Sequence, residues 1–220
     1  GRGVLKVVHA DTVRRPGKVF ADMVITNIGQ LLTMNPGKGP KRGAEARDLG
    51  IIENAFLAAS QGKVAACGPQ AAFSETVELV AGATVIDAGG KVVAPGFIDC
   101  HTHVVFAGWR GEEYGMRSRG ASYLEIAAKG GGIMSTVRAT RAASREELIE
   151  RTLGFLDEML SLGTTSCEGK SGYGLNLETE IKQLEVIREC SRLHPVDIVP
   201  TFMGAHAFPP EFKHDRKGYI

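Results

Sequence analysis

VVAPGFIDCHTH, residues 92–103, is an apolar run that ends on two histidines separated by one residue. Successive side chains of a β-strand point to opposite faces, so His101 and His103 are predicted to share one face. Neutral imidazole is a ligand for zinc, iron, copper and nickel, and a pair at one strand end can hold a metal ion. A bare His-x-His pair is also common on ordinary surfaces, so the pair alone leaves both readings open.

Strands and helices are predicted to alternate from this stretch onward. Ser144 and Glu147 form a capping-box pattern ahead of a run of apolar residues at helical spacing, and Gly163 is the expected end of that helix. The predicted elements are strands at 92–103, 164–167 and 196–203, with helices at 144–163 and 178–193. Right-handed crossovers make such strands parallel, so their polar carboxyl ends are predicted to lie on one rim.

The segments between these elements are predicted to be mostly loops. Residues 104–120 are expected to form a long loop, and residues 121–128 a short helix. The glycine triplet at 130–132 lacks the Lys-Ser/Thr of a phosphate-binding loop, and we expect a flexible loop there. Cys100 is assigned to the core rather than to a ligand set.

The residues ahead of the histidine stretch have a different pattern. Residues 1–21 are basic and weakly patterned, and they are left unassigned. Short strands are predicted near 24–32 and 83–87, with a hairpin of 55–59 and 63–67. The predicted domains are therefore an arm at 1–21, a small β-sandwich module at 22–91, and an α/β barrel segment at 92–220.

Composition limits the classes of function. The chain has 220 residues, 43% of them hydrophobic, and a net charge of +1, which gives no electrostatic case for nucleic acid or membrane-surface binding. Its four cysteines show no C-x-x-C spacing and fit reduced thiols. No apolar run reaches the length of a membrane span, and the first residues do not resemble a signal peptide. We therefore expect a cytoplasmic protein.

Longer motifs carry a resemblance to a known family. In the order and spacing of their motifs, residues from about 23 to about 212 resemble the imidazolonepropionases of the amidohydrolase superfamily. The motifs that carry this resemblance are HTHVVFAGWR, KGGGIMSTVRATRAAS, GTTSCEGKSGYGL and PTFMGAHAFPPEF, together with ITNIGQLLTM near the start. The fold expected from it is α/β: the first three βα units of a (β/α)8 barrel after a β-sandwich module.

The resemblance implies hydrolysis of the cyclic amide C–N bond of 4-imidazolone-5-propanoate to N-formimidoyl-L-glutamate, in histidine degradation. It implies one zinc or iron ion, with His101 and His103 as the first two ligands. Arg110 matches the residue that binds the substrate carboxylate, and Tyr173 and His206 match residues that contact the substrate. His206 or the metal would stabilise the oxyanion in catalysis. Lys170 is assigned to a polar network.

Three interpretations of the function remain open. The family's further ligands, a His and an Asp, and its proton-relay Glu have no counterpart in this sequence, so we expect a fragment with doubtful activity alone. A second reading is another cyclic amidohydrolase or an aminohydrolase. A third is a non-catalytic fragment that needs a partner half. A small-molecule substrate is the expected partner, with no nucleic acid or membrane, and a homodimer is left open.

Overall fold

The computed structural model describes residues 17–34, 37, 39–128 and 130–220. The chain divides into two compact units, which join in sequence between Pro95 and Gly96. The first unit contains β1 (Val19–Leu32), η1 (Gly43–Arg47), β2 (Ile51–Ser60), β3 (Lys63–Pro69), η2 (Gln70–Ala72), α1 (Phe73–Thr76), β4 (Val77–Asp87) and β5 (Val92–Val93). The second contains β6 (Phe97–Thr102), α2 (Gly111–Ser118), α3 (Tyr123–Ala128), α4 (Ile133–Ala142), α5 (Arg145–Ser161), β7 (Thr164–Lys170), α6 (Leu177–Leu193), β8 (Asp197–Thr201), η3 (Pro210–Phe212) and α7 (Arg216–Tyr219).

The first unit is built on one mixed sheet. Its strand order is β3-β2-β1-β4, and β5 also pairs with β1. The predicted hairpin is confirmed as the antiparallel pair β2 and β3. Gln61 and Gly62 connect these strands with positive φ angles of 52° and 75°, as the twist of a tight hairpin requires. All the strands described in this unit belong to that sheet, so the second layer of the predicted sandwich stays a prediction.

Two boundaries of the first unit differ from those expected. β1 begins at Val19, inside the segment left unassigned, and Ala21 is fully buried within it. The stretch 92–103 is two strands rather than one, because Val92 and Val93 pair with Gln30 and Leu31 of β1. The chain then leaves that sheet at the segment containing Pro95, a residue with no backbone N–H for a ladder.

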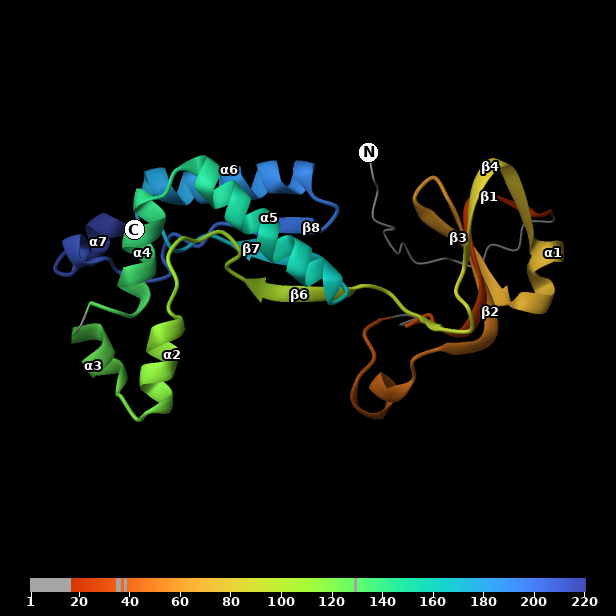
Figure 1. Cartoon of the computed structure of the whole chain (residues 1–220), viewed down its shortest axis with the longest axis horizontal. Helices are drawn as coiled ribbons and strands as arrows, with labels where there is room; N and C mark the ends of the chain where they lie inside the picture. Colours follow the sequence, from red (N-terminus) through yellow and green to blue (C-terminus); the bar gives the residue numbers. More distant parts are fainter. Residues whose placement is uncertain (1–16, 35–36, 38, 129) are drawn as a thin grey trace. The chain divides into compact units, whose positions relative to one another are not determined.

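The second unit is a three-stranded parallel sheet covered by helices. Its order is β6-β7-β8, and α5 and α6 lie side by side against it (Figure 1). The capping box predicted for α5 is confirmed: Glu147 N donates to Ser144 Oγ, and Ser144 N donates to the Glu147 carboxylate. The core joins both helices to the sheet through buried side chains of Leu148, Leu156, Val186, Ile187, Cys167 and Ile198.

One helix of this unit replaces a predicted loop, and another lies where no element was predicted. α2 lies within 104–120, and α4 begins directly after the glycine triplet. The triplet itself is non-helical, as expected; Gly132 caps α4 at a φ of 76°, and its N–H donates to Glu113 Oε1 at 2.9 Å. α4 escaped sequence reasoning because Thr136 and Thr140 occupy buried positions where an apolar periodicity would be sought.

Much of the sheet's apolar surface lies open to solvent. Phe97 and Ile98 of β6 are 69% and 73% exposed, and Val199 of β8 is 61% exposed. Cys100 is exposed as well, so its assignment to the core is wrong. No helix within the described residues has both the length and the apolar character needed to cross a membrane.

Candidate active site

The two histidines of the HTH motif lie together at the carboxyl end of β6. His101 is the penultimate residue of the strand, and His103 follows one residue after its end. Their ring centroids are 6.1 Å apart, with the planes inclined at 66°. Thr102, between them, donates from Oγ1 to the Glu168 carbonyl of β7 at 2.7 Å, which holds this strand end against its neighbour.

His103 is the centre of a cluster of three rings. Its ring stacks on that of His206, with centroids 4.6 Å apart and planes inclined at 14°. The Tyr173 ring is 4.7 Å from His103 and 5.6 Å from His206. Burial lowers the pKa of His103, and the neighbouring charge of His206 lowers it further. His103 therefore favours the neutral form in which an imidazole binds metals.

A loop carbonyl fixes the orientation of His206. Its Nδ1 lies 3.0 Å from the Gly172 carbonyl oxygen, which can only accept a hydrogen bond. A neutral ring that donates from Nδ1 keeps a lone pair on Nε2. Gly172 has a φ of 111°, and a Cβ there would lie 2.9 Å from His206 Nδ1. The contact therefore depends on glycine at this position.

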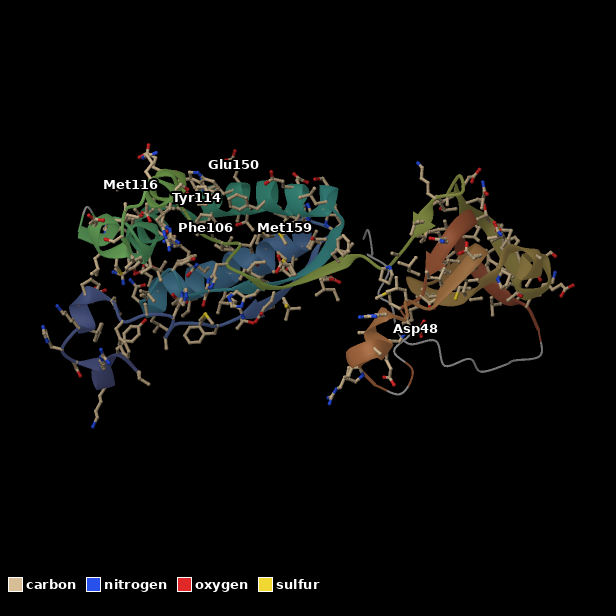
Figure 2. All side chains as sticks on the ribbon, turned by 90° about the horizontal axis from the view of Figure 1, so that it is seen from below. Asp48, Phe106, Tyr114, Met116, Glu150 and Met159 are labelled. Atoms are coloured by element: carbon tan, nitrogen blue, oxygen red, sulfur yellow. The ribbon has the colours of Figure 1, made fainter. Side chains whose placement is uncertain are left out.

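A pocket of about 410 Å³ opens beside these rings. It is lined by His103, Phe106, Trp109, Arg110, Gly111, Thr136 and Tyr173. Phe106, labelled in Figure 2, also stacks on Phe155 with centroids 5.4 Å apart. The wall is thus aromatic on several sides, with one guanidinium, one imidazole and one phenol as its ionisable groups.

Arg110 enters this pocket from the start of α2. It is the residue before the first turn, and its side chain is 38% exposed. Its ion pair with Glu113 is long, at 4.0 Å between Nη1 and Oε2. A guanidinium held this loosely can still turn its N–H edge toward a carboxylate in the pocket.

Sequence reasoning did not find the other walls of the pocket. Trp109 is the only tryptophan of the chain and directly precedes Arg110, and these two facts could have pointed to it. Thr136 lies in α4, a helix that was not predicted, so nothing in the local pattern pointed to it. The predicted residues His103, Arg110 and Tyr173 line the pocket directly, whereas His206 reaches it by stacking on His103.

The described residues supply only part of the ligand set for a metal ion. His103 Nδ1 is buried and has no hydrogen-bond partner among the residues that the structure describes. An unpartnered buried imidazole nitrogen beside a second histidine fits the donor set of zinc or iron. Within the described ranges, however, no group of three or more His, Cys, Asp or Glu side chains could hold an ion. The pair supplies two ligands, where catalytic zinc commonly takes three from protein.

β7, the strand beside β6, carries a charged pair near its carboxyl end. Lys170 is 8% exposed, and its Nζ is 2.5 Å from Glu168 Oε1, which also accepts from Thr201 Oγ1 at 2.6 Å. The hydrogen bonds from Lys170 and Thr201 lower the pKa of Glu168. The assignment of Lys170 to a polar network is confirmed, and the network ties β7 to β8.

Comparisons with known proteins agree with the family resemblance. A sequence model described as "Amidohydrolase family" matches residues 84–133. An imidazolonepropionase of Symbiobacterium thermophilum is 51% identical over 90% of this chain and 46% of its own length. One from Alkaliphilus metalliredigens is 48% identical over 92% of this chain and 48% of its own length.

A solved structure was also matched. It is an uncharacterized metal-dependent hydrolase from Pyrococcus furiosus, 15% identical, with a TM-score of 0.47, covering 82% of this chain and 50% of that one. The chain spans about half the length of the curated relatives it matches. Over nine-tenths of its length, the sequence of this chain is about half identical to those of curated imidazolonepropionases, and residues 84–133 match the amidohydrolase model.

Proposed function

We propose that this chain carries the first part of the active site of an imidazolonepropionase. The proposed reaction hydrolyses the ring C–N bond of 4-imidazolone-5-propanoate to give N-formimidoyl-L-glutamate, a step in histidine degradation. The observation that carries the proposal is the meeting of His103, Arg110 and Tyr173 around one pocket, beside His206. The curated relatives named imidazolonepropionase support the choice of substrate.

The proposed fold follows the same reading. We propose that β6, β7 and β8, with α5 and α6, are the first three βα units of a (β/α)8 barrel. The parallel order and the helical cover support this, because barrel enzymes keep their chemistry at the carboxyl ends of the strands. The first unit, which ends at Pro95, would be part of a β-sandwich module, and the barrel segment would begin at Gly96.

Each residue of the site has a proposed part in binding. Arg110 would take the propanoate carboxylate in a two-point contact, which its planar fork favours. The Tyr173 hydroxyl would orient the small ring against the aromatic wall. His101 and His103 would hold one zinc or iron ion together with ligands outside this sequence. When bound, such an ion supplies Lewis-acid polarisation and lowers the pKa of water to about 7.

His206 would handle a proton during ring opening. Water adds across the C–N bond: the carbonyl carbon gains oxygen and becomes a carboxylate, and the ring nitrogen takes a proton. Since Nδ1 is directed at the Gly172 carbonyl, Nε2 of the neutral ring accepts a proton and the imidazolium donates it. Oxyanion stabilisation by His206 would therefore need the charged ring.

A hybrid enzyme tests this proposal. In the hybrid, this chain replaces the matching residues of the Symbiobacterium thermophilum relative. We expect turnover of 4-imidazolone-5-propanoate and bound zinc or iron detected by metal analysis. His101→Ala with His103→Ala should remove both, whereas His214→Ala, at an exposed position, should change neither. A folded, metal-loaded hybrid that opens hydantoins or deaminates guanine instead would overturn the substrate assignment.

Arg110 gives a sharper test of the substrate's carboxylate. Arg110→Lys in the hybrid should raise KM about 10- to 100-fold with little change in kcat, because a two-point charged contact is lost. Arg117→Lys, a charged neighbour on α2, is the control. If the two changes had equal effects on KM, Arg110 would not be the residue that binds the substrate's carboxylate.

A second candidate role is supported by the open sheet. Phe97 and Ile98 are exposed on β6, which is what a fragment that pairs with a partner half would show. Sizing of the 220-residue chain alone and mixed with the relative's remaining half tests this, and also tests the homodimer. The proposed partners are otherwise a small-molecule substrate, with neither nucleic acid nor membrane, and the proposed location is the cytoplasm.

A further inference from the structure

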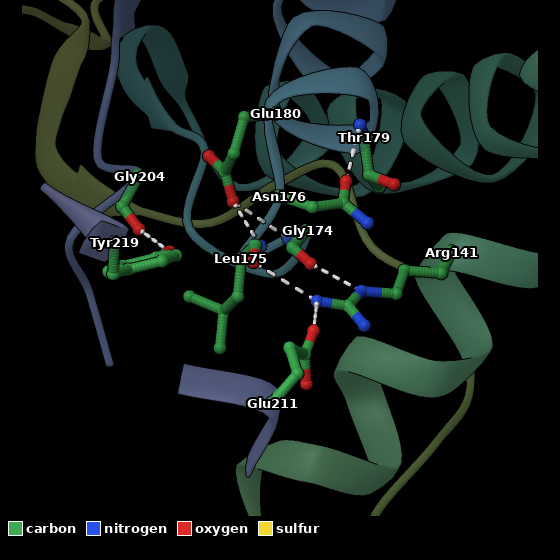
Figure 3. Close-up of polar contacts among 9 residues, drawn as sticks. All are labelled: Arg141, Gly174, Leu175, Asn176, Thr179, Glu180, Gly204, Glu211 and Tyr219. Carbon is green, nitrogen blue, oxygen red and sulfur yellow. Dashed lines mark hydrogen bonds and ion pairs between the residues drawn. The ribbon is translucent and has the colours of Figure 1, made fainter. Parts of the chain in front are cut away.

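The loop that carries Tyr173 is held by a buried carboxylate. This segment, residues 172–175, is called here the Tyr173 loop. Backbone N–H groups of Gly172, Gly174 and Leu175 donate to Glu180, each at 2.8 Å (Figure 3 draws those of Gly174 and Leu175). Glu180 lies in the first turn of α6 and is 1% exposed. Three donors on one buried carboxylate are strong, charge-assisted bonds.

The carbonyl groups of the same loop are held from a different helix. Arg141 of α4 donates from Nε to the Gly174 carbonyl at 2.7 Å and from Nη2 to the Leu175 carbonyl at 3.0 Å. Nη2 also pairs with Glu211 at 2.8 Å, so Figure 3 shows the guanidinium bridging the loop and η3. Side chains of two helices thus bind the donors and the acceptors of the loop.

This clamp holds a backbone shape that the chain would not take unaided. Gly172 and Leu175 have φ angles of 111° and 52°, and Leu175 is not a glycine. Gly174 passes so close to α6 that a Cβ there would lie 2.7 Å from Glu180 N. The loop backbone therefore lies in close contact with the first turn of α6.

The clamp leads directly to the rings of the candidate site. Gly172 donates its N–H to Glu180, and its carbonyl faces Nδ1 of His206 at 3.0 Å. Tyr173 lies between two clamped glycines, and its own N–H donates to Gln183 Oε1 at 3.3 Å. A displacement of Gly172 would thus move the tyrosine and the histidine together.

We propose that Glu180 is a positioning residue, which sets Tyr173 and His206 against His103 through the backbone of the Tyr173 loop. Its importance for substrate rests on the proposed function, but the coupling of the loop to the two rings does not. The competing role is helix capping. Asn176 already performs that role for α6, because its Oδ1 accepts from Thr179 N at 2.8 Å.

The test is Glu180→Gln in the 220-residue chain. Gln keeps the size of the side chain, but its NH2 group must face the Gly172 N–H or the Gly174 and Leu175 N–H groups. We expect amide hydrogen exchange at the unpaired positions to rise about 10- to 100-fold, the effect of losing a charge-assisted bond. The 15N resonances of the His206 ring should also shift, because its Gly172 acceptor moves. Glu178→Gln, an exposed glutamate in the same helical turn, is the matched control.

Two further variants keep the outcome decisive. Asn176→Ala should raise exchange through α6 and leave the His206 resonances in place. If Glu180→Gln does not fold, Arg141→Lys loosens the loop from its other side and should also shift the His206 ring signals. Unchanged His206 resonances in a folded Glu180→Gln or Arg141→Lys chain would overturn the proposal. An inactive hybrid with these shifts intact would count only against the proposed function.

Discussion

The ends of β6 and β7 carry neighbouring parts of one candidate site, yet they are held in different ways. β6 is an edge strand whose residues are exposed apart from the half-buried Thr102. β7 is the central strand, buried at its carboxyl end, and the loop after it is bound by side chains of α4 and α6. The second unit thus holds the loop after β7 through side chains of two helices, whereas the strand that leads to the histidine pair is hydrogen-bonded to a single neighbouring strand.

A matched pair of isoleucines gives the largest expected contrast between the two strands' surroundings. Ile187 is fully buried in α6 against Gly169 of β7. Ile187→Ala should lower the free energy of unfolding by about 2–5 kcal/mol. Ile98 of β6 is 73% exposed, and Ile98→Ala should stay within about 0.5 kcal/mol. Urea unfolding followed by Trp109 fluorescence measures both, and equal costs would mean that β6 is covered in solution.

The cysteines of the same two strands should differ in reactivity. Burial raises the pKa of Cys167 on β7 to about 11, so only about 0.1% of it is thiolate at pH 8. Cys100 on β6 is exposed. Iodoacetamide at pH 8, read by peptide mass spectrometry, should modify Cys100 at least about 100-fold faster. Similar rates would show that β7 opens as readily as the edge.

Substitutions of two glycines test how tightly the loop after β7 is held. Gly172→Ala places a side chain at a φ of 111° and against His206, and should cost about 1–3 kcal/mol. Gly154 lies in α5 with open space around its Cβ position, so Gly154→Ala should stabilise the chain by up to about 1 kcal/mol. Thermal unfolding compares them. A neutral Gly172→Ala would mean that the loop is not shaped as described.

Elements with a regular pattern were predictable from sequence. The hairpin of β2 and β3 was signalled by its turn, and α5 by Ser144 and Glu147 at its start. Both signals depend on residues that are close together in the sequence, so they can be recognised without the fold. The alternation of strand and helix likewise indicated the parallel order of β6, β7 and β8.

Features that depend on distant partners were not predictable. Val93 pairs with Leu31 of β1, far away in sequence, which divides a stretch that looks like one strand. Cys100 sits in an apolar run but faces solvent, because β6 is an edge. Glu180 looks like one more acidic residue on a helix, and only the fold brings three backbone donors to it.

Among the described residues, each outer strand of the parallel sheet, β6 and β8, has a strand partner on one side only. Edge strands of this kind accept strands from other molecules, the more so where apolar side chains such as Phe97 and Val199 accompany them. Purification of the 220-residue chain should therefore be dominated by colloidal behaviour: turbidity that grows with protein concentration and recedes in mild chaotrope. A lysine introduced at Val199 would be the simplest solubilising change, and it leaves the pocket untouched.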